Sequence, residues 1–350
     1  SRAVVITSLA ASLMVGAFAI STQSYWIDEA LSLIVSMAPN PAEAWKYAQV
    51  VSGSTLQMPL YQVYLFAWHK IFGGGEWAMR ASNLPWFVLG QLAFLILLRH
   101  KPKLALTSCL LASVSPLLWM YLDETRPYIM QYAAACWLAA ALVRFSSPLH
   151  SPLATRHPSL LLLALGAAAV ILFGSSLLGV VWLGGFLAAL AWLQFTRSPA
   201  HPSAPSPQTS SPAPPAWPRL PTAACVIILA AVTIALSAYY LWTWSMAGGG
   251  YHRSGRSLLS LPFIAYEFLG FSGFGPGKLQ MRAEPVTSLI QGIPALLPLA
   301  VILAALGLFV LLQLRRHTLE RRIVIAWILA LGLPSLILTL GLFWSEHRVL

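Results

Sequence analysis

The sequence predicts an all-α polytopic membrane protein, and three observations support this fold class. The chain is 58% hydrophobic and only 9% charged, whereas a soluble domain is about a quarter charged. Uncharged runs recur that are long enough, at about 20 residues as helix, to cross ~30 Å of hydrocarbon. Basic clusters lie between the runs, as they do beside membrane spans. We therefore expect a transmembrane helix bundle with about nine spans.

The nine uncharged runs cover approximately 3–21, 81–98, 104–120, 127–143, 159–173, 177–195, 221–245, 288–314 and 323–343. The first run lacks both a preceding basic cluster and a following small-residue cleavage pattern, so it is predicted to be a retained helix rather than a secretory signal. Cys109, Cys136 and Cys225 fall inside the runs without paired or metal-ligand spacing. They are predicted to be apolar packing residues.

The basic clusters set the predicted topology. RHKPK (99–103), the loop with Arg144 and Arg156, and RRHTLERR (315–322) belong in the cytoplasm under the positive-inside rule, together with the N-terminus. The net charge of +11 follows from these flanks and does not predict nucleic-acid binding. With this topology only Glu320, of the ten Asp and Glu residues, is cytoplasmic. This sidedness predicts a working face outside the cytoplasm.

The topology divides the chain into residues 1–145 with a first outer loop at 22–79, helices in 146–197, a linker at 198–220, and residues 221–350 with an outer loop at 246–287. Within the first outer loop, 59–74 is short for a span and contains His69 and Lys70. We expect an interfacial helix there, anchored by Tyr61, Tyr64 and Trp68. The linker is rich in Pro and Ser and is predicted to be an unfolded cytoplasmic segment.

The chain has only two aspartates, and each is followed directly by a glutamate: Asp28-Glu29 and Asp123-Glu124. Both pairs fall where a predicted helix meets the outer face. Partial desolvation at such a boundary raises the pKa of a carboxyl group and a nearby Arg lowers it, and the group can serve as a general base for an acceptor hydroxyl. The alternative is a pair of solvated helix caps. Two such pairs on one side favour a catalytic role.

Basic residues on the same side are candidate anion ligands. Arg126 and Tyr128 follow the second acidic pair, although Arg126 could equally be a snorkelling anchor or a salt-bridge partner of the acids. Arg253 and Arg256 lie in the Gly-rich outer loop 246–287, which suits an anionic lipid headgroup or serves as a surface loop facing anionic lipid. No metal motif is present, and a divalent cation at Asp28 and Asp123 stays open as an alternative.

Three stretches resemble the membrane-embedded GT-C glycosyltransferases, in the branch of protein O-mannosyltransferases and lipid A aminoarabinose transferases. WIDEA (26–30) resembles the Asp-Glu motif of the family's first outer loop. QMPLYQVYLFAWHKIFGGGEWAMRASNLPW (57–86) resembles its His/Lys-Pro-Pro-Leu-Tyr segment, with the Phe-Gly turn, the acidic residue and the Arg-x-x-x-x-Pro pattern that follow. YLDETRPY (121–128) is similar to its acidic-x-Arg-x-Tyr motif. Together they cover roughly the first 145 residues.

The resemblance implies an inverting transferase that moves a sugar from a polyprenyl phosphate to a lipid, glycan or protein acceptor at the outer face of the cytoplasmic membrane. Carried over by position, Asp28 would be the general base, and Glu29 would orient either the acceptor or the loop. Asp123 and Glu124 would be acids on the acceptor side of the site or ligands of an ion. Arg126 and Tyr128 would support the side of the site that carries Asp123 and Glu124. No nucleotide-binding motif is present.

Two departures from the family pattern matter. Gln57 replaces the family's His or Lys, and Met58 replaces the first Pro, so Arg253 or Arg256 would have to contact the donor phosphate. WSEHRVL (344–350) resembles the start of a further outer segment, and we expect a complete relative to be longer. A transporter is the main rival function, although the predicted spans hold no ionisable residue of the kind expected near the midplane. A lipid-linked glycan ligase and a scaffold protein also stay open.

Overall fold

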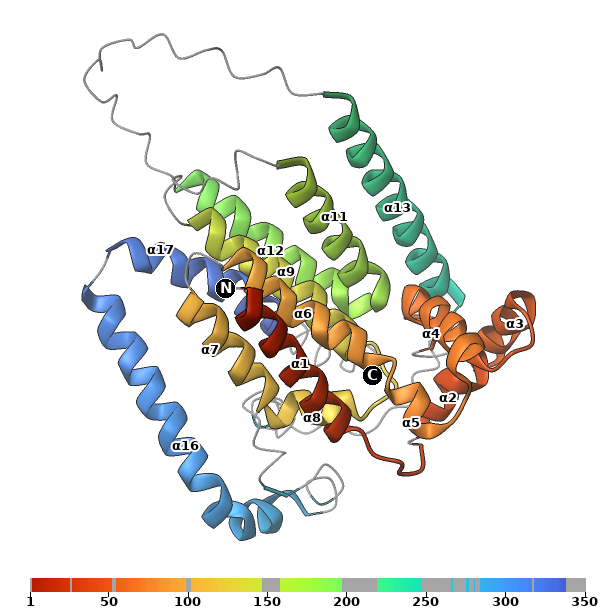
Figure 1. The fold of residues 1–350 in the computed structure, drawn as a ribbon, viewed down its shortest axis with the longest axis horizontal. Helices are drawn as coiled ribbons and strands as arrows, with labels where there is room; N and C mark the ends of the chain where they lie inside the picture. Colours follow the sequence, from red (N-terminus) through yellow and green to blue (C-terminus); the bar gives the residue numbers. More distant parts are fainter. Residues whose placement is uncertain are drawn as a thin grey trace, which may run out of the picture.

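The computed structural model describes residues 2–25, 27–51, 55–98, 102–146, 158–196, 219–246, 266, 275–276, 280, 284–316 and 318–337. Within these ranges every regular element is a helix and there is no strand. Figure 1 shows long helices running side by side, with a group of shorter helices at one end. The expected all-α class is confirmed.

The N-terminal part contains α1 (Arg2–Ala19), α2 (Ile27–Ser36), α3 (Pro41–Val51), α4 (Pro59–Phe72), α5 (Glu76–Arg80), α6 (Asn83–Leu97), α7 (Pro102–Ser113), α8 (Pro116–Leu122) and α9 (Tyr128–Ser146). The C-terminal part contains α11 (Pro158–Ser175), α12 (Leu177–Phe195), α13 (Arg219–Met246), α16 (Pro285–Arg316), α17 (Thr318–Trp327) and a π-helical turn, η3 (Ile328–Gly332).

Helix α6 is the centre of the N-terminal bundle and packs against α9, α1 and α7. Small residues allow these close approaches. A Cβ atom added to Gly90 of α6 would lie 2.7 Å from Cε1 of Tyr132 on α9, and one added to Gly16 of α1 would lie 2.8 Å from Cδ2 of Leu84. Both separations are shorter than carbon atoms tolerate. At Gly90 the neighbours are the aromatic ring of Tyr132 and the backbone of Ala133, so glycine sets the α6–α9 spacing there, whereas at Gly16 the flexible end of Leu84 can move aside.

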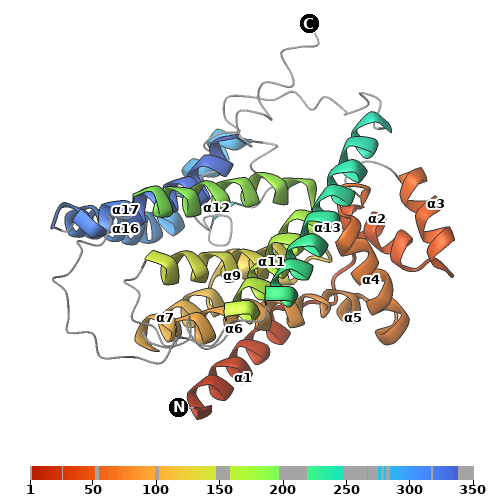
Figure 2. The same cartoon turned by 90° about the horizontal axis from the view of Figure 1, so that it is seen from above.

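Helix α9 joins this bundle to the C-terminal helices. One apolar cluster is formed by α9, α11, α12 and the α17–η3 segment, with the buried residues Ala134, Leu138, Leu142, Ala168, Leu172, Phe186, Ala189, Leu193, Ala326 and Ala330. Helices α13 and α16 stand at opposite flanks of the molecule (Figure 1). The view from above shows α12 and α17 on one side of α9 and α11, and α1 on the other (Figure 2).

Where the structure describes the predicted spans, all but the run at 104–120 follow helical segments, but the number of membrane crossings is not confirmed. Within the described ranges one stretch of helix, Val286–Phe309, is both long and apolar enough to cross a membrane. Shorter apolar stretches are Val5–Ala19, Tyr128–Leu142, Leu163–Ser175, Leu177–Leu193, Ala230–Thr243 and Arg322–Ile337.

The expectation of one continuous helix over 104–120 was wrong. Helix α7 ends at Ser113, and α8 begins at Pro116 with Ser115 as its N-cap. The hydroxyl of Ser115 accepts a hydrogen bond from the backbone N of Leu118 at 3.4 Å. A Ser cap followed by Pro in the first helical turn is a helix start, so local capping overrides the apolar run.

The first outer loop folds as a compact group of helices, α2 to α5. Gly73 ends α4 with φ of 83°, a left-handed conformation that favours glycine, and the chain then turns into α5. Of the predicted interfacial anchors on α4, Tyr61 lies inside the protein, whereas Tyr64 and Trp68 are half-buried. Tyr61 is fully buried, Tyr64 donates a hydrogen bond to the carbonyl of Ser82 at 2.6 Å, and Trp68 donates one to the carbonyl of Ala78 at 2.8 Å. Tyr64 and Trp68 therefore contact α5 and the start of α6, and the interfacial position of α4 stays a prediction.

Candidate functional site

The two acidic motifs meet in the structure. The backbone N of Thr125 donates a hydrogen bond of 2.7 Å to Oε1 of Glu29, across 96 positions of sequence. Nη1 of Arg126 donates to the backbone carbonyl of Asp28 and to the hydroxyl of Ser32, both at 3.3 Å. The start of α2 and the turn between α8 and α9 therefore form one site.

Glu29 is buried and paired with Arg80, the last residue of α5. Its side chain is 1% exposed and that of Arg80 is 3% exposed. Nε of Arg80 lies 3.2 Å from Oε1 of Glu29, and Nη2 lies 3.0 Å from Oε2. Two parallel N–H···O contacts of this kind fix the geometry of both groups. Glu29 therefore holds the site together.

Arg80 also binds the segment that connects α1 to α2. Its Nη1 donates to the carbonyl of Gln23 at 2.8 Å and to the carbonyl of Ser21 at 3.2 Å. The Arg80 guanidinium lies over the ring of Tyr25, 5.4 Å from the ring centroid, while the hydroxyl of Tyr25 donates to the carbonyl of Gly74 at 3.2 Å. The connecting segment is thus held across the buried ion pair.

Several charges act on these groups. Burial lowers the pKa of the Arg80 guanidinium, but the hydrogen bond and charge of Glu29, with the charge of Asp123, outweigh burial and raise it above its usual value. Burial raises the pKa of Tyr25 to about 12, with Arg80 acting in the opposite direction. Arg80 therefore stays cationic and Tyr25 neutral at physiological pH.

Asp123 completes the network from the other motif. Its Oδ1 accepts a hydrogen bond of 2.5 Å from the backbone N of Ser21, and its Oδ2 accepts one of 2.8 Å from the Ser21 hydroxyl. Nε of Arg80 lies 3.8 Å from Oδ1 of the same carboxylate. The side chain of Asp123 is therefore occupied in joining the end of α8 to the end of α1.

Asn83 fixes the turn that carries the second motif. Its amide nitrogen donates to the backbone carbonyls of Tyr121, Leu122 and Glu124 at 3.3, 3.1 and 2.6 Å. Asn83 is fully buried at the start of α6. Because one side chain serves three carbonyls, it holds Thr125 and Arg126 in position against α2.

Asp28 differs from the other three acids. It lies in the first turn of α2, where a carboxylate interacts favourably with the helix dipole. It is exposed, and within the described part of the chain its carboxylate makes no hydrogen bond or ion pair. Its backbone is fixed by Arg126. The arrangement leaves one carboxylate open to solvent beside a buried polar network.

The remaining residues that the sequence predicted for the site do not all lie beside Asp28 and Glu29. The ring of Tyr128 packs against Tyr121 with centroids 4.5 Å apart. The carbonyl of Gln57 accepts a hydrogen bond from the backbone N of Leu177 at 2.9 Å, which places this residue at the α11–α12 junction. Glu124 is partly buried in the turn fixed by Asn83. Arg253 and Arg256 lie outside the described residues.

Sequence reasoning missed Arg80, Ser21 and Asn83 as site residues. Arg80 and the following Pro85 were part of the stretch that resembles the GT-C family, in the pattern Arg-x-x-x-x-Pro. Arg80 also stands directly before an uncharged run. Those two signals could have identified it, whereas nothing in the sequence distinguishes Ser21 or Asn83 from other small polar residues at helix ends.

The site offers little for a metal ion. In the part of the chain that the structure describes, no group of three or more His, Cys, Asp and Glu side chains is arranged to hold one. The alternative ion site at Asp28 and Asp123 gains no support, because the oxygens of Asp123 accept from Ser21 and face Arg80.

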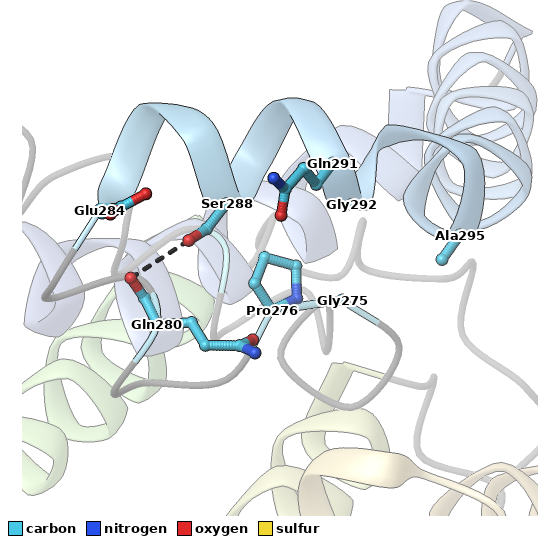
Figure 3. A pocket seen from close by; sticks show the side chains of 8 residues that line it. All are labelled: Gly275, Pro276, Gln280, Glu284, Ser288, Gln291, Gly292 and Ala295. Carbon is cyan, nitrogen blue, oxygen red and sulfur yellow. Dashed lines mark hydrogen bonds between the residues drawn. The ribbon is translucent and has the colours of Figure 1, made fainter.

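A separate hollow of about 470 Å³ lies at the start of α16 (Figure 3). Its described lining residues are Gly275, Pro276, Gln280, Glu284, Ser288, Gln291, Gly292 and Ala295. The hydroxyl of Ser288 donates to the carbonyl of Gln280 at 3.2 Å (Figure 3). None of these residues belongs to the two acidic motifs, and this described lining carries no cation to receive a phosphate.

Comparisons of the chain with protein families, with curated proteins and with solved structures found no match.

Proposed function

We propose that the chain is an integral membrane glycosyltransferase with its site on the extracytoplasmic face. It transfers a sugar from a polyprenyl-phosphate donor to a lipid, glycan or protein acceptor, with inversion. The observation that carries the proposal is the contact between the Asp28-Glu29 and Asp123-Glu124 motifs, through Thr125 to Glu29 and Arg126 to Asp28. The sequence resemblance to GT-C enzymes predicts that these two motifs act together.

Asp28 is the proposed general base, because it is the exposed carboxylate of the site while Glu29 and Asp123 are held by Arg80 and Ser21. The carboxylate of Asp28 takes the proton of the acceptor hydroxyl or amine. The freed lone pair attacks the anomeric carbon, and the bond from that carbon to the phosphate oxygen breaks. The polyprenyl phosphate leaves with the electron pair.

The remaining residues position these atoms. Arg126 fixes the backbone of Asp28, and the Glu29–Arg80 pair fixes the first turn of α2. Positioning of this kind contributes much of the rate in reactions whose leaving group is already charged. Arg253 and Arg256 are the proposed cations for the departing phosphate, on the sequence reasoning alone.

The test is Asp28→Asn in the purified protein, reconstituted in liposomes with a panel of polyprenyl-phosphate sugars and soluble acceptors. Loss of a general base costs about 10²–10⁴-fold in turnover, with donor binding retained. Glu43→Gln is the matched control, because Glu43 is a carboxylate of the same outer segment that pairs with the exposed Lys46. This control keeps full turnover.

Full turnover of Asp28→Asn would remove the base role. Accumulation of a solute inside the liposomes, with no new glycosidic bond formed by the wild type, would favour the transporter reading instead. Charge reversal of Arg253 or Arg256 is expected to raise the donor KM more than the acceptor KM. An unchanged donor KM would remove both residues from the site.

A further inference from the structure

An exposed aromatic patch joins the first outer loop to the end of α13. It consists of Trp45 on α3 and of Tyr239 and Trp242 on α13. The rings of Trp45 and Trp242 stack with centroids 5.4 Å apart, and Tyr239 lies 6.0 Å from Trp242. Trp45 is 42% exposed and Trp242 is 36% exposed. The hydroxyl of Tyr239 donates to the carbonyl of Leu56 at 2.8 Å, which ties the patch to the chain before α4.

The surroundings of the patch are mainly aliphatic, with one lysine that pairs with Glu43. On α3, Val50 is 83% exposed and Lys46 is an exposed cation. On α13, Ile234 and Leu241 are 69% and 74% exposed. Amphipathic rings beside exposed aliphatic side chains and a lysine are typical of the boundary between acyl chains and headgroups. The patch is continuous with the exposed apolar flank of α13, a predicted span.

The same features argue against a sugar as the occupant. A saccharide ring needs an open aromatic face bordered by hydrogen-bonding groups. Here Trp45 and Trp242 cover one face of each other, with planes 26° apart. On α13 the exposed Ile234 and Leu241 are aliphatic, and the hydroxyl of the exposed Ser245 already donates to the carbonyl of Trp242. A lipid surface satisfies ring edges, aliphatic side chains and Lys46 at once.

We infer that α3 and the end of α13 dock into the outer-leaflet headgroup layer through this aromatic patch. The inference rests on the membrane placement in the proposed function. It assigns an anchoring role to α3, in addition to α4, where Tyr61, one of the three predicted anchors, is buried. Because Val35 of α2 packs with Ala48 of α3 and with Leu56, the depth of α3 also sets the height of α2, which carries Asp28.

The test places a single fluorescent label at position 50. In a Cys225→Ser background, where Cys109 and Cys136 are buried, Val50→Cys is labelled with an environment-sensitive dye. The full chain is then reconstituted in nanodiscs of phosphatidylethanolamine and phosphatidylglycerol. We expect quenching by lipids that carry a nitroxide near the headgroup and protection from a water-soluble quencher. Trp45→Ala and Trp242→Ala should each reduce the lipid quenching.

Trp77→Ala is the matched control, since Trp77 is 46% exposed on α5 and lies outside the patch. It should leave the lipid quenching unchanged. If the label at position 50 is quenched by the water-soluble quencher and not by the nitroxide lipids, the inference is overturned. This measurement uses the Val50→Cys protein with all aromatic residues intact, so it does not depend on how the Trp variants fold. Protection of the label by a soluble oligosaccharide, in place of lipid, would also overturn it and indicate a glycan surface. Neither readout requires glycosyl transfer, so failure of the proposed enzyme activity would be seen separately.

Discussion

Replacing Arg80 with methionine tests the structural core of the site. Methionine has an apolar stem of similar length but no charge and no donor, so Glu29 would be left 1% exposed with the backbone N of Thr125 as its remaining contact among those described above. Breaking a buried ion pair from one side costs about 3–5 kcal/mol. Native domains have only about 5–15 kcal/mol of stability in total. We therefore expect Arg80→Met to remove a large share of the free energy of unfolding.

The magnitude can be separated into parts by a double-mutant cycle. Glu29→Leu/Arg80→Met removes both charges and leaves the carbonyls of Ser21 and Gln23 without their donor, each worth about 0.5–1.5 kcal/mol. The double variant should therefore be less destabilised than the sum of the single variants, by at least about 2 kcal/mol. The free energy of unfolding is measured by denaturant titration in detergent micelles.

The exposed pair of Lys46 and Glu43 is the internal control. Its side chains are 65% and 33% exposed, and exposed pairs contribute little to stability. Lys46→Met should leave the unfolding transition where it is. An effect of Arg80→Met under about 1 kcal/mol, or simple additivity of the two single variants, would contradict the claim that a buried ion pair holds the site.

Three further predictions concern the surroundings of the pair. Asn83→Ala removes the amide donor shared by three backbone carbonyls of the second motif, and it should lower the free energy of unfolding by about 1–3 kcal/mol. An unchanged unfolding transition would show that the turn keeps its conformation without Asn83. Gly90→Ala places a methyl group 2.7 Å from Cε1 of Tyr132 and should lower the free energy of unfolding by about 1–3 kcal/mol. A thermal unfolding midpoint equal to that of the wild type would mean that α6 and α9 can move apart at no cost. The folded protein holds the Tyr25 proton up to a pKa of about 12 while the unfolded chain loses it near 10, so stability should fall as pH rises between these values. Other tyrosines whose pKa is raised by burial add to the same slope. Tyr25→Phe should therefore reduce the alkaline slope, and an identical slope would contradict the burial of Tyr25.

Much of the fold was predictable because long apolar runs determine helix positions. The runs at 127–143, 159–173 and 177–195 correspond to α9, α11 and α12. The run at 104–120 misled because Ser115 and Pro116 start a new helix inside it. Of the aromatic residues predicted to anchor α4, Tyr61 is buried and Tyr64 and Trp68 are half-buried. Amphipathic rings satisfy a headgroup layer and a protein interior equally well, and only packing distinguishes the two.

The division of labour among the acids could not be predicted. Sequence identified Asp28, Glu29, Asp123 and Glu124 as residues on one side of the predicted membrane, but adjacent carboxylates look alike along the chain. Their environments differ because α2 turns Glu29 inward toward Arg80 and leaves Asp28 facing out.

The sequence by itself determined that the chain is helical and that both of its aspartates stand in Asp-Glu pairs, since composition and apolar run length act locally along the chain. The tertiary structure decided which carboxylate is open and which is buried. It also selected Arg80 as the partner of Glu29 and α3 as the site of the exposed rings. These outcomes depend on contacts between segments 50 or more positions apart, and the cost of burying a charge is fixed only when those segments meet.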